Sequence, residues 1–535
     1  MRKIIVLPFL FLGLLSFLDA TISTPSIFGD NMVLQREHPC PIWGKADANA
    51  SITLTFAGKT YRVRADEVGA WQITLDPQPA SKKPLTMVIS DFRFNSFDRI
   101  HKNFHSRLKN QPGSIVYENI LIGEVWLCSG QSNMQWGVNM SDDSDLESLS
   151  AVYPQLRLIT IPQTGSQVPQ TDFQGAWESA TPETSANFSA VGYFFGRRLH
   201  QILGVPVGLI DNSWGGSTCE AWIPKDRLQI HPLAQPYLRE WQAKEKDYNF
   251  NSQLEDYKKR LAHWELANKQ GKSKSRRPRA PRNQMTGQHR PANLYNGVLH
   301  PIIGYGIKGA IWYQGESNAG RGYAYREIFP LMVQSWRQAW GQEDFPFYWT
   351  QLADYGNEES EPGDSSWAEL RESQTISLQK VRNGGEAVII DAGEGRDIHP
   401  RNKQIVANRL LRHALANDYG HKIPHQSPLY KSMKINGSRI VIEFMHTGEG
   451  LYCFDSRTPK GFAICGKDQK FVWADAKIVG KDSIEVWSDS IPSPTAVRYA
   501  WSDNPVCNLY RKDGAVTLPL TPFRTDDFSL ITMGK

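Results

Sequence analysis

The sequence has few cysteines, little net charge and no internal repeat. Its six cysteines form no C-x-x-C pair, which argues against a zinc site or a thioredoxin-like redox centre. A formal net charge of +5 over 535 residues gives no support for a nucleic-acid partner. The composition, 40% hydrophobic and 21% charged, is that of a soluble globular protein and excludes collagen-like or disordered chains.

Long apolar runs are also scarce. The one clear run, residues 4–18, follows Arg2 and Lys3 and ends just before Ala20. This order of charged, apolar and small residues predicts a cleaved signal peptide over residues 1–20, and therefore a secreted or periplasmic protein. The run is short for a membrane span, which needs about 20 residues, so no stable membrane insertion is expected.

Export to an oxidising compartment permits disulfides. We expect Cys453 to pair with either Cys465 or Cys507. Cys128 and Cys219 fall in apolar stretches and are expected to be buried thiols in core strands.

Three regions follow the signal peptide. Residues 21–113 contain short alternating runs separated by turn residues, which predict an N-terminal β domain followed by a linker over 92–113. Residues 114–420 alternate apolar runs with helical patterns, and residues 421–535 return to strand patterns, either as a separate β region or packed on the first.

The middle region predicts an α/β fold. Its apolar runs are suited to buried parallel strands, and helical patterns lie between them, so a doubly wound parallel sheet is expected. The predicted strands are residues 125–128, 207–210, 309–313, 345–350 and 387–390.

A helical insertion is expected over about 237–290, where helix-forming residues recur without a strand signal. Its basic run, residues 271–282, is either a solvated loop or a lip that attracts anionic glycans.

Ligands of open parallel sheets bind beyond the carboxyl ends of the strands. Ser132 follows the first strand in the run Gly130-Gln-Ser-Asn-Met134. Gly130 permits a tight turn, and the start of a helix favours negative charge developing near the Ser132 hydroxyl. The run is not the G-x-S-x-G elbow, because Met134 replaces its last glycine.

Later strands are followed by groups that complete an acyl-transfer site. Backbone N–H groups of Ser132 and of Gly215 or Gly216, with the Asn318 side chain, are candidate oxyanion donors. His399 follows the last predicted strand and is the candidate general base.

The chain resembles the sialate O-acetylesterase family, within the SGNH hydrolase superfamily. The resemblance rests on ordered blocks that cover most of the mature chain: Gly130-Gln-Ser-Asn-Met134, Trp214-Gly-Gly216, Gln314-Gly-Glu-Ser-Asn318, Asp397-Ile-His-Pro-Arg-Asn402, Leu294-Tyr-Asn-Gly297 and Trp367-Ala-Glu-Leu-Arg371.

It implies a flavodoxin-like sheet flanked by β-sandwich-like units, with neither a metal nor an organic cofactor. By resemblance Ser132 is the nucleophile, His399 the base, and Gly216 and Asn318 help to bind the oxyanion. Gln131 and Arg371 are weaker candidates for substrate binding.

The acid that orients the imidazole is left open. The superfamily pattern is Asp-x-x-His, but Arg396 occupies the position three before His399, and Asp397 lies only two before it. Asp397 and Glu316 rank equally, Asp391 is a further candidate, and a Ser-His dyad with a backbone carbonyl is the remaining alternative.

The resemblance favours O-acetylated sialic acid as substrate. The alternatives are an esterase for acetylated xylan or another polysaccharide, and a secreted glycan-binding protein without catalysis. A carboxylate-bearing sialic acid needs a cationic or amide partner in the site, whereas xylan does not.

Overall fold

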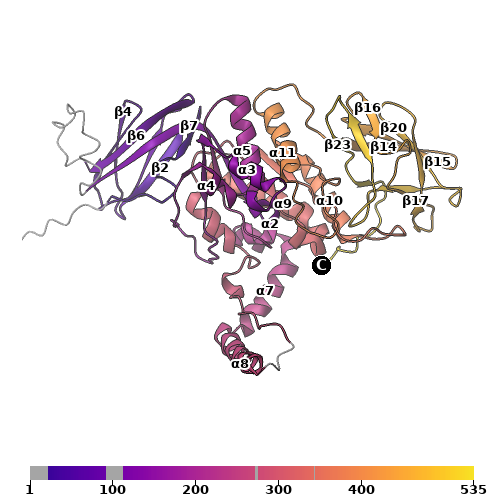
Figure 1. Ribbon diagram of the computed structural model, residues 1–535, viewed down its shortest axis with the longest axis horizontal. Helices are drawn as coiled ribbons and strands as arrows, with labels where there is room; N and C mark the ends of the chain where they lie inside the picture. Colours follow the sequence, from indigo (N-terminus) through magenta and orange to yellow (C-terminus); the bar gives the residue numbers. More distant parts are fainter. Residues whose placement is uncertain (1–21, 92–112, 271–274, 343) are drawn as a thin grey trace, which may run out of the picture.

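The computed structural model describes residues 22–91, 113–270, 275–342 and 344–535. An N-terminal β region, a central α/β region and a C-terminal β region follow one another along the long axis of the molecule (Figure 1). The expected signal peptide and residues 92–112 of the expected linker lie outside the described residues. None of the helices in the described ranges is long and apolar enough to cross a membrane.

The central region is built on a sheet in the order β13-β12-β11-β7-β10-β8-β9. All of these strands are parallel to their neighbours except β9, which pairs antiparallel to β8. The strands are β7 (Ser114–Gly130), β8 (Tyr153–Thr160), β9 (Glu178–Ala180), β10 (Val207–Asp211), β11 (Gly309–Tyr313), β12 (Phe347–Thr350) and β13 (Gly384–Ala387). The expected α/β class is therefore confirmed.

Helices cover both faces of this sheet, which is why β10 and β11 are buried at every position. Alternate side chains of β7 enter different cores: Val125 and Leu127 pack in one, Trp126 and Cys128 in the other. The first core contains residues of α9 (Gly322–Trp340) and α10 (Ser366–Ile376), and the second contains residues of α5 (Ala190–Leu203) and α11 (Lys403–Asn417). Short helices α3 (Ser144–Leu149), α4 (Pro182–Ala186) and α6 (Lys225–Ile230) lie in the connections.

The direction of strand addition reverses beside β7. After β7 the chain forms β8 and then returns to β10, which pairs with one edge of β7; it then forms β11 on the opposite edge of β7. Crevices outside the carboxyl ends of the strands at such a reversal are the usual ligand sites of open α/β sheets. The end of β7 is thus the first place to look for a functional site.

The sequence did not predict every strand correctly. β8 was missed because Pro154, Gln155 and Arg157 interrupt its apolar pattern; Arg157 is nevertheless buried, with its guanidinium donating to the carbonyls of Pro154 and Asn31. The last strand ends at Ala387 instead of continuing through residue 390; beyond it Val388 and Ile390 pack in the core of the C-terminal β region, whereas Ile389 packs in the central region.

The N-terminal β region is joined to the central sheet through β7. The first half of this 17-residue strand pairs with β6 and β1, and its last residues pair with β10 and β11. Strands β1 (Val33–Gln35), β3 (Ser51–Phe56), β4 (Lys59–Arg64) and β6 (Ser81–Asp91) extend this sheet, while β2 (Cys40–Lys45) and β5 (Ala70–Leu75) form a separate pair. Apolar residues of this region share one core with the central region.

The C-terminal β region has its own core and three small sheets. Their strands are β14 (Leu429–Asn436), β15 (Arg439–Met445), β16 (Gly450–Cys453), β17 (Phe462–Cys465), β18 (Val472–Trp473), β19 (Asp475–Ile478), β20 (Ser483–Trp487), β21 (Ala496–Tyr499), β22 (Leu509–Lys512), β23 (Leu518–Pro519) and β24 (Phe523–Arg524). Figure 1 shows this region at the opposite end of the molecule from the N-terminal one. Of the two alternatives, the C-terminal region is therefore a separate β region and is not packed on the N-terminal one.

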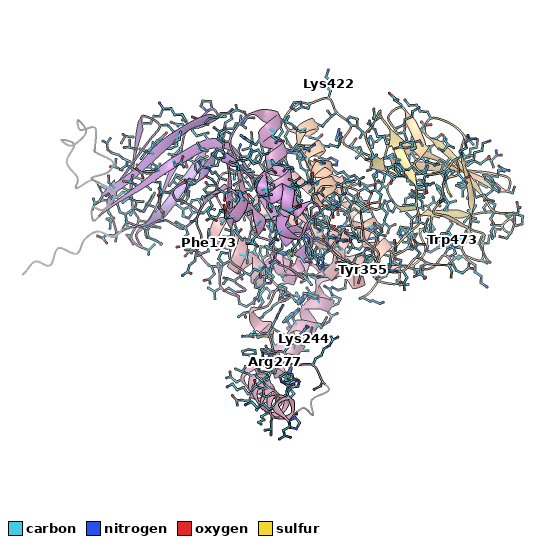
Figure 2. The ribbon with its side chains drawn as sticks, viewed as in Figure 1. Phe173, Lys244, Arg277, Tyr355, Lys422 and Trp473 are labelled. Atoms are coloured by element: carbon cyan, nitrogen blue, oxygen red, sulfur yellow. The ribbon has the colours of Figure 1, made fainter. Side chains whose placement is uncertain are left out.

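Two helices occupy the expected insertion and form an arm. They are α7 (Gln235–Asp247) and α8 (Phe250–Lys269), and they project away from the body of the molecule (Figure 1). Arg277, from the basic run, lies on this arm beside α8 (Figure 2) and is solvent-exposed, as are Arg276 and Arg279.

Candidate active site

Ser132 lies at the carboxyl end of the central strand β7. The strand ends at Gly130, and Ser132 is the first residue of the short helix α2 (Ser132–Gln135). Gly130 has φ +139°, and a Cβ built there would lie 2.1 Å from the carbonyl oxygen of Tyr313 on β11. Only glycine fits this turn, so the turn that presents Ser132 depends directly on residue 130.

His399 reaches Ser132 from the loop between β13 and α11. Its Nε2 lies 2.8 Å from the Ser132 Oγ, a hydrogen-bonding distance. The imidazole also stacks on the indole of Trp136, with ring centroids 4.6 Å apart and an interplanar angle of 13°. Stacking fixes the plane of the imidazole, so that one nitrogen faces the hydroxyl.

Asp397 lies on the other side of the His399 ring. Its Oδ1 is 3.5 Å from Nδ1 of His399 and accepts a 2.9 Å hydrogen bond from the His399 backbone N–H. Its side chain is 53% exposed, so water screens the pair. Burial lowers the pKa of His399, the charge of Lys403 lowers it further, and Asp397 opposes both. His399 is therefore neutral at pH 7 and able to accept a proton.

Glu316 belongs to a buried polar network behind the serine. The Asn133 Nδ2 donates to Glu316 Oε1 at 2.5 Å and to the carbonyl of Ile398 at 3.0 Å, while Lys403 Nζ donates to Asn133 Oδ1 at 2.5 Å. Glu316 is thus linked through Asn133 to the backbone of Ile398, the residue before His399. The carboxylate that lies beside the imidazole itself is that of Asp397.

Burial shifts both ionisable members of this network toward their neutral forms. It raises the pKa of Glu316 and lowers the pKa of Lys403 to about 7, in spite of their mutual attraction. Asp391, the third candidate acid, is engaged elsewhere: its two carboxylate oxygens accept from Arg409 at 2.5 and 2.8 Å.

A turn of two glycines faces Ser132 after β10. The N–H of Gly215 donates to Gln135 Oε1 at 2.8 Å, and a Cβ at Gly215 would lie 3.4 Å from that of Ser132. Gly216 has φ +73°, and its carbonyl accepts a 2.9 Å hydrogen bond from the Ser317 hydroxyl, which fixes the turn. Of the two glycines, Gly215 thus has its N–H already engaged by a side chain of the site.

Asn318 is buried and holds neighbouring loops together. Its Oδ1 accepts from the Cys219 N–H at 2.9 Å and from Gln314 Nε2 at 2.7 Å, and its Nδ2 donates to Glu220 at 2.9 Å. A contribution of Asn318 to the oxyanion hole would have to use the second proton of Nδ2.

A cleft of about 740 Å³ opens in front of Ser132 and His399. Its lining is mostly polar or aromatic, and within the described part of the chain it contains no arginine or lysine. The other lining residues are Gln135, Trp136, Gly137, Asn139, Met140, Thr160, Ile161, Pro162, Gln163, Asn187, Asp211 and Ser213. This size suits a sugar with its acetyl group.

Asp211 lines this cleft from the end of β10, and burial raises the pKa of its carboxyl to about 6. Among the described residues, no group of histidine, cysteine and acidic side chains is arranged to hold a metal ion.

Sialate O-acetylesterases resemble this chain along nearly its whole length. That of Mus musculus is 29% identical over 555 residues, covering 93% of each chain, and that of Homo sapiens is 28% identical, covering 93% of this chain and 91% of the other. A carbohydrate acetylesterase from Xanthomonas citri has a crystal structure that is 33% identical, with a TM-score of 0.76, and covers 95% of this chain and 100% of its own. The chain belongs to the sialate O-acetylesterase family. No family model matches the chain.

In this family member, neither of the expected substrate-binding side chains faces the cleft. Arg371 is 0% exposed and donates to the carbonyls of Leu352, Ala353, Ser502 and Asp503. It therefore ties the C-terminal region to the central one, and its expected role in substrate binding is wrong.

Gln131 is likewise buried, and its Oε1 accepts from the N–H groups of Gly315 and Ser317 at 3.4 and 3.3 Å. It therefore holds the loop of Glu316 against the turn that carries Ser132.

The expected disulfide is also absent. All six cysteines lie within the described residues, and all six are free thiols, including Cys453, Cys465 and Cys507. Cys128 is a buried thiol in β7 as expected, whereas Cys219 is buried in the 3-10 helix η3 (Cys219–Trp222) and not in a strand.

Three residues of the site were not predicted: Trp136, Asn133 and Lys403. Asn133 directly follows Ser132, but the sequence does not show that its amide bridges two loops. Lys403 lies four residues after His399 at the start of α11, and only the fold reveals that it is buried.

Proposed function

We propose that this chain is a carbohydrate O-acetylesterase with Ser132 as nucleophile and His399 as general base. The observation that carries the proposal is the 2.8 Å contact between His399 Nε2 and Ser132 Oγ in the cleft at the end of β7. Membership of a family whose named members are esterases supports the same reaction.

The reaction proceeds in two acyl transfers. His399 accepts the Oγ proton while Oγ attacks the acetyl carbonyl, and the carbonyl oxygen becomes an oxyanion that accepts from the N–H groups of Ser132 and Gly216. The N–H of Ser132 is available because the first residues of a helix have no intrahelical acceptor. The ester C–O bond then breaks, and the sugar oxygen leaves with the proton that His399 returns.

Water, deprotonated by His399, attacks the acetyl-enzyme in the second step and releases acetate. The imidazolium that forms in both steps is stabilised by the charge of Asp397, which we propose as the orienting acid. Glu316 acts instead as a positioning residue, because it holds Asn133 and, through Asn133, the chain at Ile398.

Two substrate classes remain to be separated. The names of the relatives from mouse and human favour O-acetylated sialic acid. The cleft favours a neutral acetylated sugar such as xylan, because its described lining offers a sialic carboxylate only amides such as Gln135 and Gln163, without the ionic pairing of an arginine or lysine, and includes the acid Asp211. On this ground we propose a neutral acetylated sugar as the substrate.

We also propose that the chain is exported, because residues 1–20 have the pattern of a signal peptide.

The test measures acetate release from 9-O-acetylated sialic acid and from acetylated xylan by the wild type and by Ser132→Ala. Faster turnover of xylan, lost in Ser132→Ala, is the expected result. Faster turnover of the sialic acid ester would assign the other substrate class. If the folded protein hydrolysed neither ester, the proposed esterase activity would be refuted, and a glycan-binding function would be the remaining alternative.

A further inference from the structure

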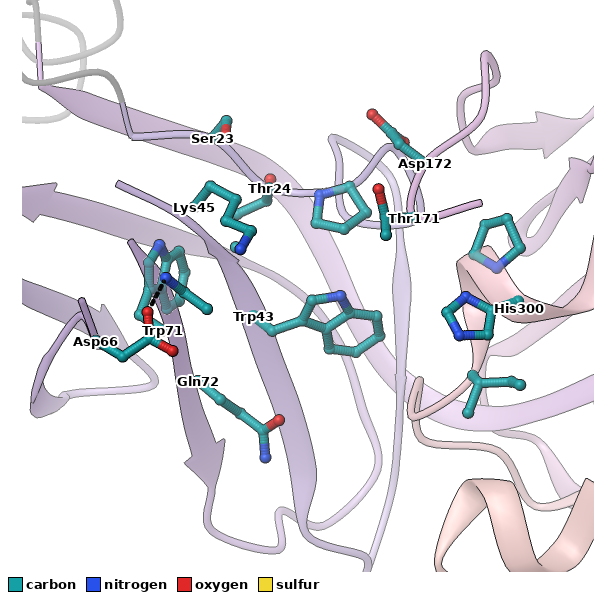
Figure 3. Close-up of a pocket in the computed structure, with 15 residues that line it drawn as sticks. Ser23, Thr24, Trp43, Lys45, Asp66, Trp71, Gln72, Thr171, Asp172 and His300 are labelled. Carbon is teal, nitrogen blue, oxygen red and sulfur yellow. Dashed lines mark hydrogen bonds between the residues drawn. The ribbon is translucent and has the colours of Figure 1, made fainter. Parts of the chain in front are cut away.

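A second cavity lies between the N-terminal β region and the central region. Its volume is about 630 Å³, and Figure 3 shows it between strands of the N-terminal region and the segment that carries His300. One wall is formed from β2 and β5, and the other from the loop after β8 and the 3-10 helix η7 (His300–Ile302). Clefts where two regions meet are frequent ligand sites.

Trp43 gives this cavity an aromatic platform. Figure 3 places its indole in the middle of the cavity, with His300 on one side and Asp66 and Trp71 on the other. The ring is only partly buried, and an edge-to-face contact with Phe28, with centroids 4.6 Å apart, fixes its plane. The electron-rich face of a fixed indole attracts the weakly positive C–H groups of a pyranose ring.

Polar groups surround this platform. Trp71 is 4% exposed. Its Nε1 is a buried donor without a hydrogen-bond partner among the described residues. The Nδ1 of His300 bonds the Gln170 carbonyl at 2.7 Å, which turns Nε2 away from that backbone.

The two carboxylates of the lining each use one oxygen to fix a loop: Oδ1 of Asp66 accepts from the N–H groups of Val68 and Ala70, and Oδ1 of Asp172 from those of Ser26 and Phe173. Carboxylate, imidazole and amide groups around an aromatic ring match the hydroxyls of a sugar.

We propose that this cavity is a second, non-catalytic binding site for a neutral saccharide. Lys45 is the one ammonium among the lining residues, and Asp66 and Asp172 offset it, so an anionic sugar gains nothing here. The ligand class is therefore a neutral pyranose of an oligosaccharide chain.

One loop connects this cavity with the catalytic cleft. Gln163 lines the cleft and Thr171 lines the cavity. The eight residue steps between them span at most about 28 Å, since an extended chain advances about 3.5 Å per residue. This distance is within the length of a polysaccharide of several units, so that binding at the second site would raise the local concentration of its acetyl groups at Ser132.

Isothermal titration calorimetry of the full chain with xylotetraose and sialyllactose tests this site. The Ser132→Ala background removes any hydrolysis, so the result does not depend on the proposed esterase activity. We expect xylotetraose to bind, and Trp43→Leu in this background to weaken it at least about tenfold, as loss of an aromatic anchor typically does. The matched control Trp473→Leu removes an exposed tryptophan of β18 and should leave the affinity unchanged.

Folding is checked by thermal melting, and if Trp43→Leu does not fold, Gln72→Ala takes its place, because Gln72 lines the cavity from an exposed position on β5. A loss of affinity by a folded variant supports the site. Equal affinity of the background and the folded cavity variant, no binding of xylotetraose, or tighter binding of sialyllactose would each overturn the proposal.

Discussion

Asp397→Asn separates the charge of the proposed orienting acid from its hydrogen bond. The asparagine oxygen can still accept from the His399 backbone N–H, which the carboxylate accepts at 2.9 Å, so the loop keeps its conformation. What is lost is the negative charge 3.5 Å from Nδ1 of His399. The substitution therefore measures how much that charge stabilises the imidazolium formed in the reaction.

The structure sets the size of the effect. At 3.5 Å two unit charges attract by about 1.2 kcal/mol in water and by about 4.7 kcal/mol at a dielectric constant of about 20. Because the side chains are 25% and 53% exposed, the value in water is the better guide. It corresponds to a loss of about eightfold in kcat, far below the loss of about 10⁴ seen when a buried triad aspartate becomes asparagine.

Steady-state kinetics on one soluble acetyl ester, with kcat and KM measured separately, checks this value. The control is Asp145→Asn, an exposed aspartate of α3, which should leave kcat unchanged. The acidic limb of the pH profile should move to lower pH in Asp397→Asn, because the carboxylate raises the pKa of His399. A loss near 10⁴-fold, or no loss at all, would refute the reasoning.

Further substitutions probe the groups around Ser132. Gly130→Ala should fail to fold or be destabilised by several kcal/mol in a chemical denaturation series, because its Cβ would meet a backbone oxygen 2.1 Å away; near-native stability would contradict this. Asn133→Ala removes the side-chain donor of buried Glu316 and should lower the free energy of unfolding by about 3 kcal/mol in the same assay, whereas a change below about 1 kcal/mol would show that the network is not needed. Lys403→Met removes a charge that lowers the pKa of His399, so the acidic limb of the profile of kcat/KM against pH should move to higher pH; a shift to lower pH would exclude this coupling.

The sequence predicts correctly those parts of the protein in which the local pattern of apolar residues matches their burial in the fold. β10 and β11 are unbroken apolar runs because both faces are covered, and the predicted ranges match them within one residue. The pairing of Ser132 with His399 was also expected from the sequence, because Ser132 directly follows a central strand and His399 lies in the loop after the last strand of the same parallel sheet.

The remaining features depend on contacts that no local pattern shows. Arg371 has a long, positively charged side chain and belongs to a motif that resembles the family's, which made it a candidate for substrate binding. Its guanidinium instead donates to four backbone carbonyls, which lie up to 132 residues away in the sequence. The choice between Asp397 and Glu316 was undecidable from spacing, because it depends on how the loop after β13 turns around His399. The cysteines of the C-terminal region are likewise free thiols, although their spacing in the sequence allowed a disulfide.

The central claim is that Ser132 carries the acetyl group during turnover. The most direct measurement is acid quenching of the wild type during hydrolysis of an acetylated sugar, followed by peptide mass spectrometry, with Ser132→Ala in parallel. The account predicts one acetyl group on the peptide that contains Ser132 and no turnover by the variant. An unmodified peptide together with undiminished acetate release by folded Ser132→Ala would contradict it.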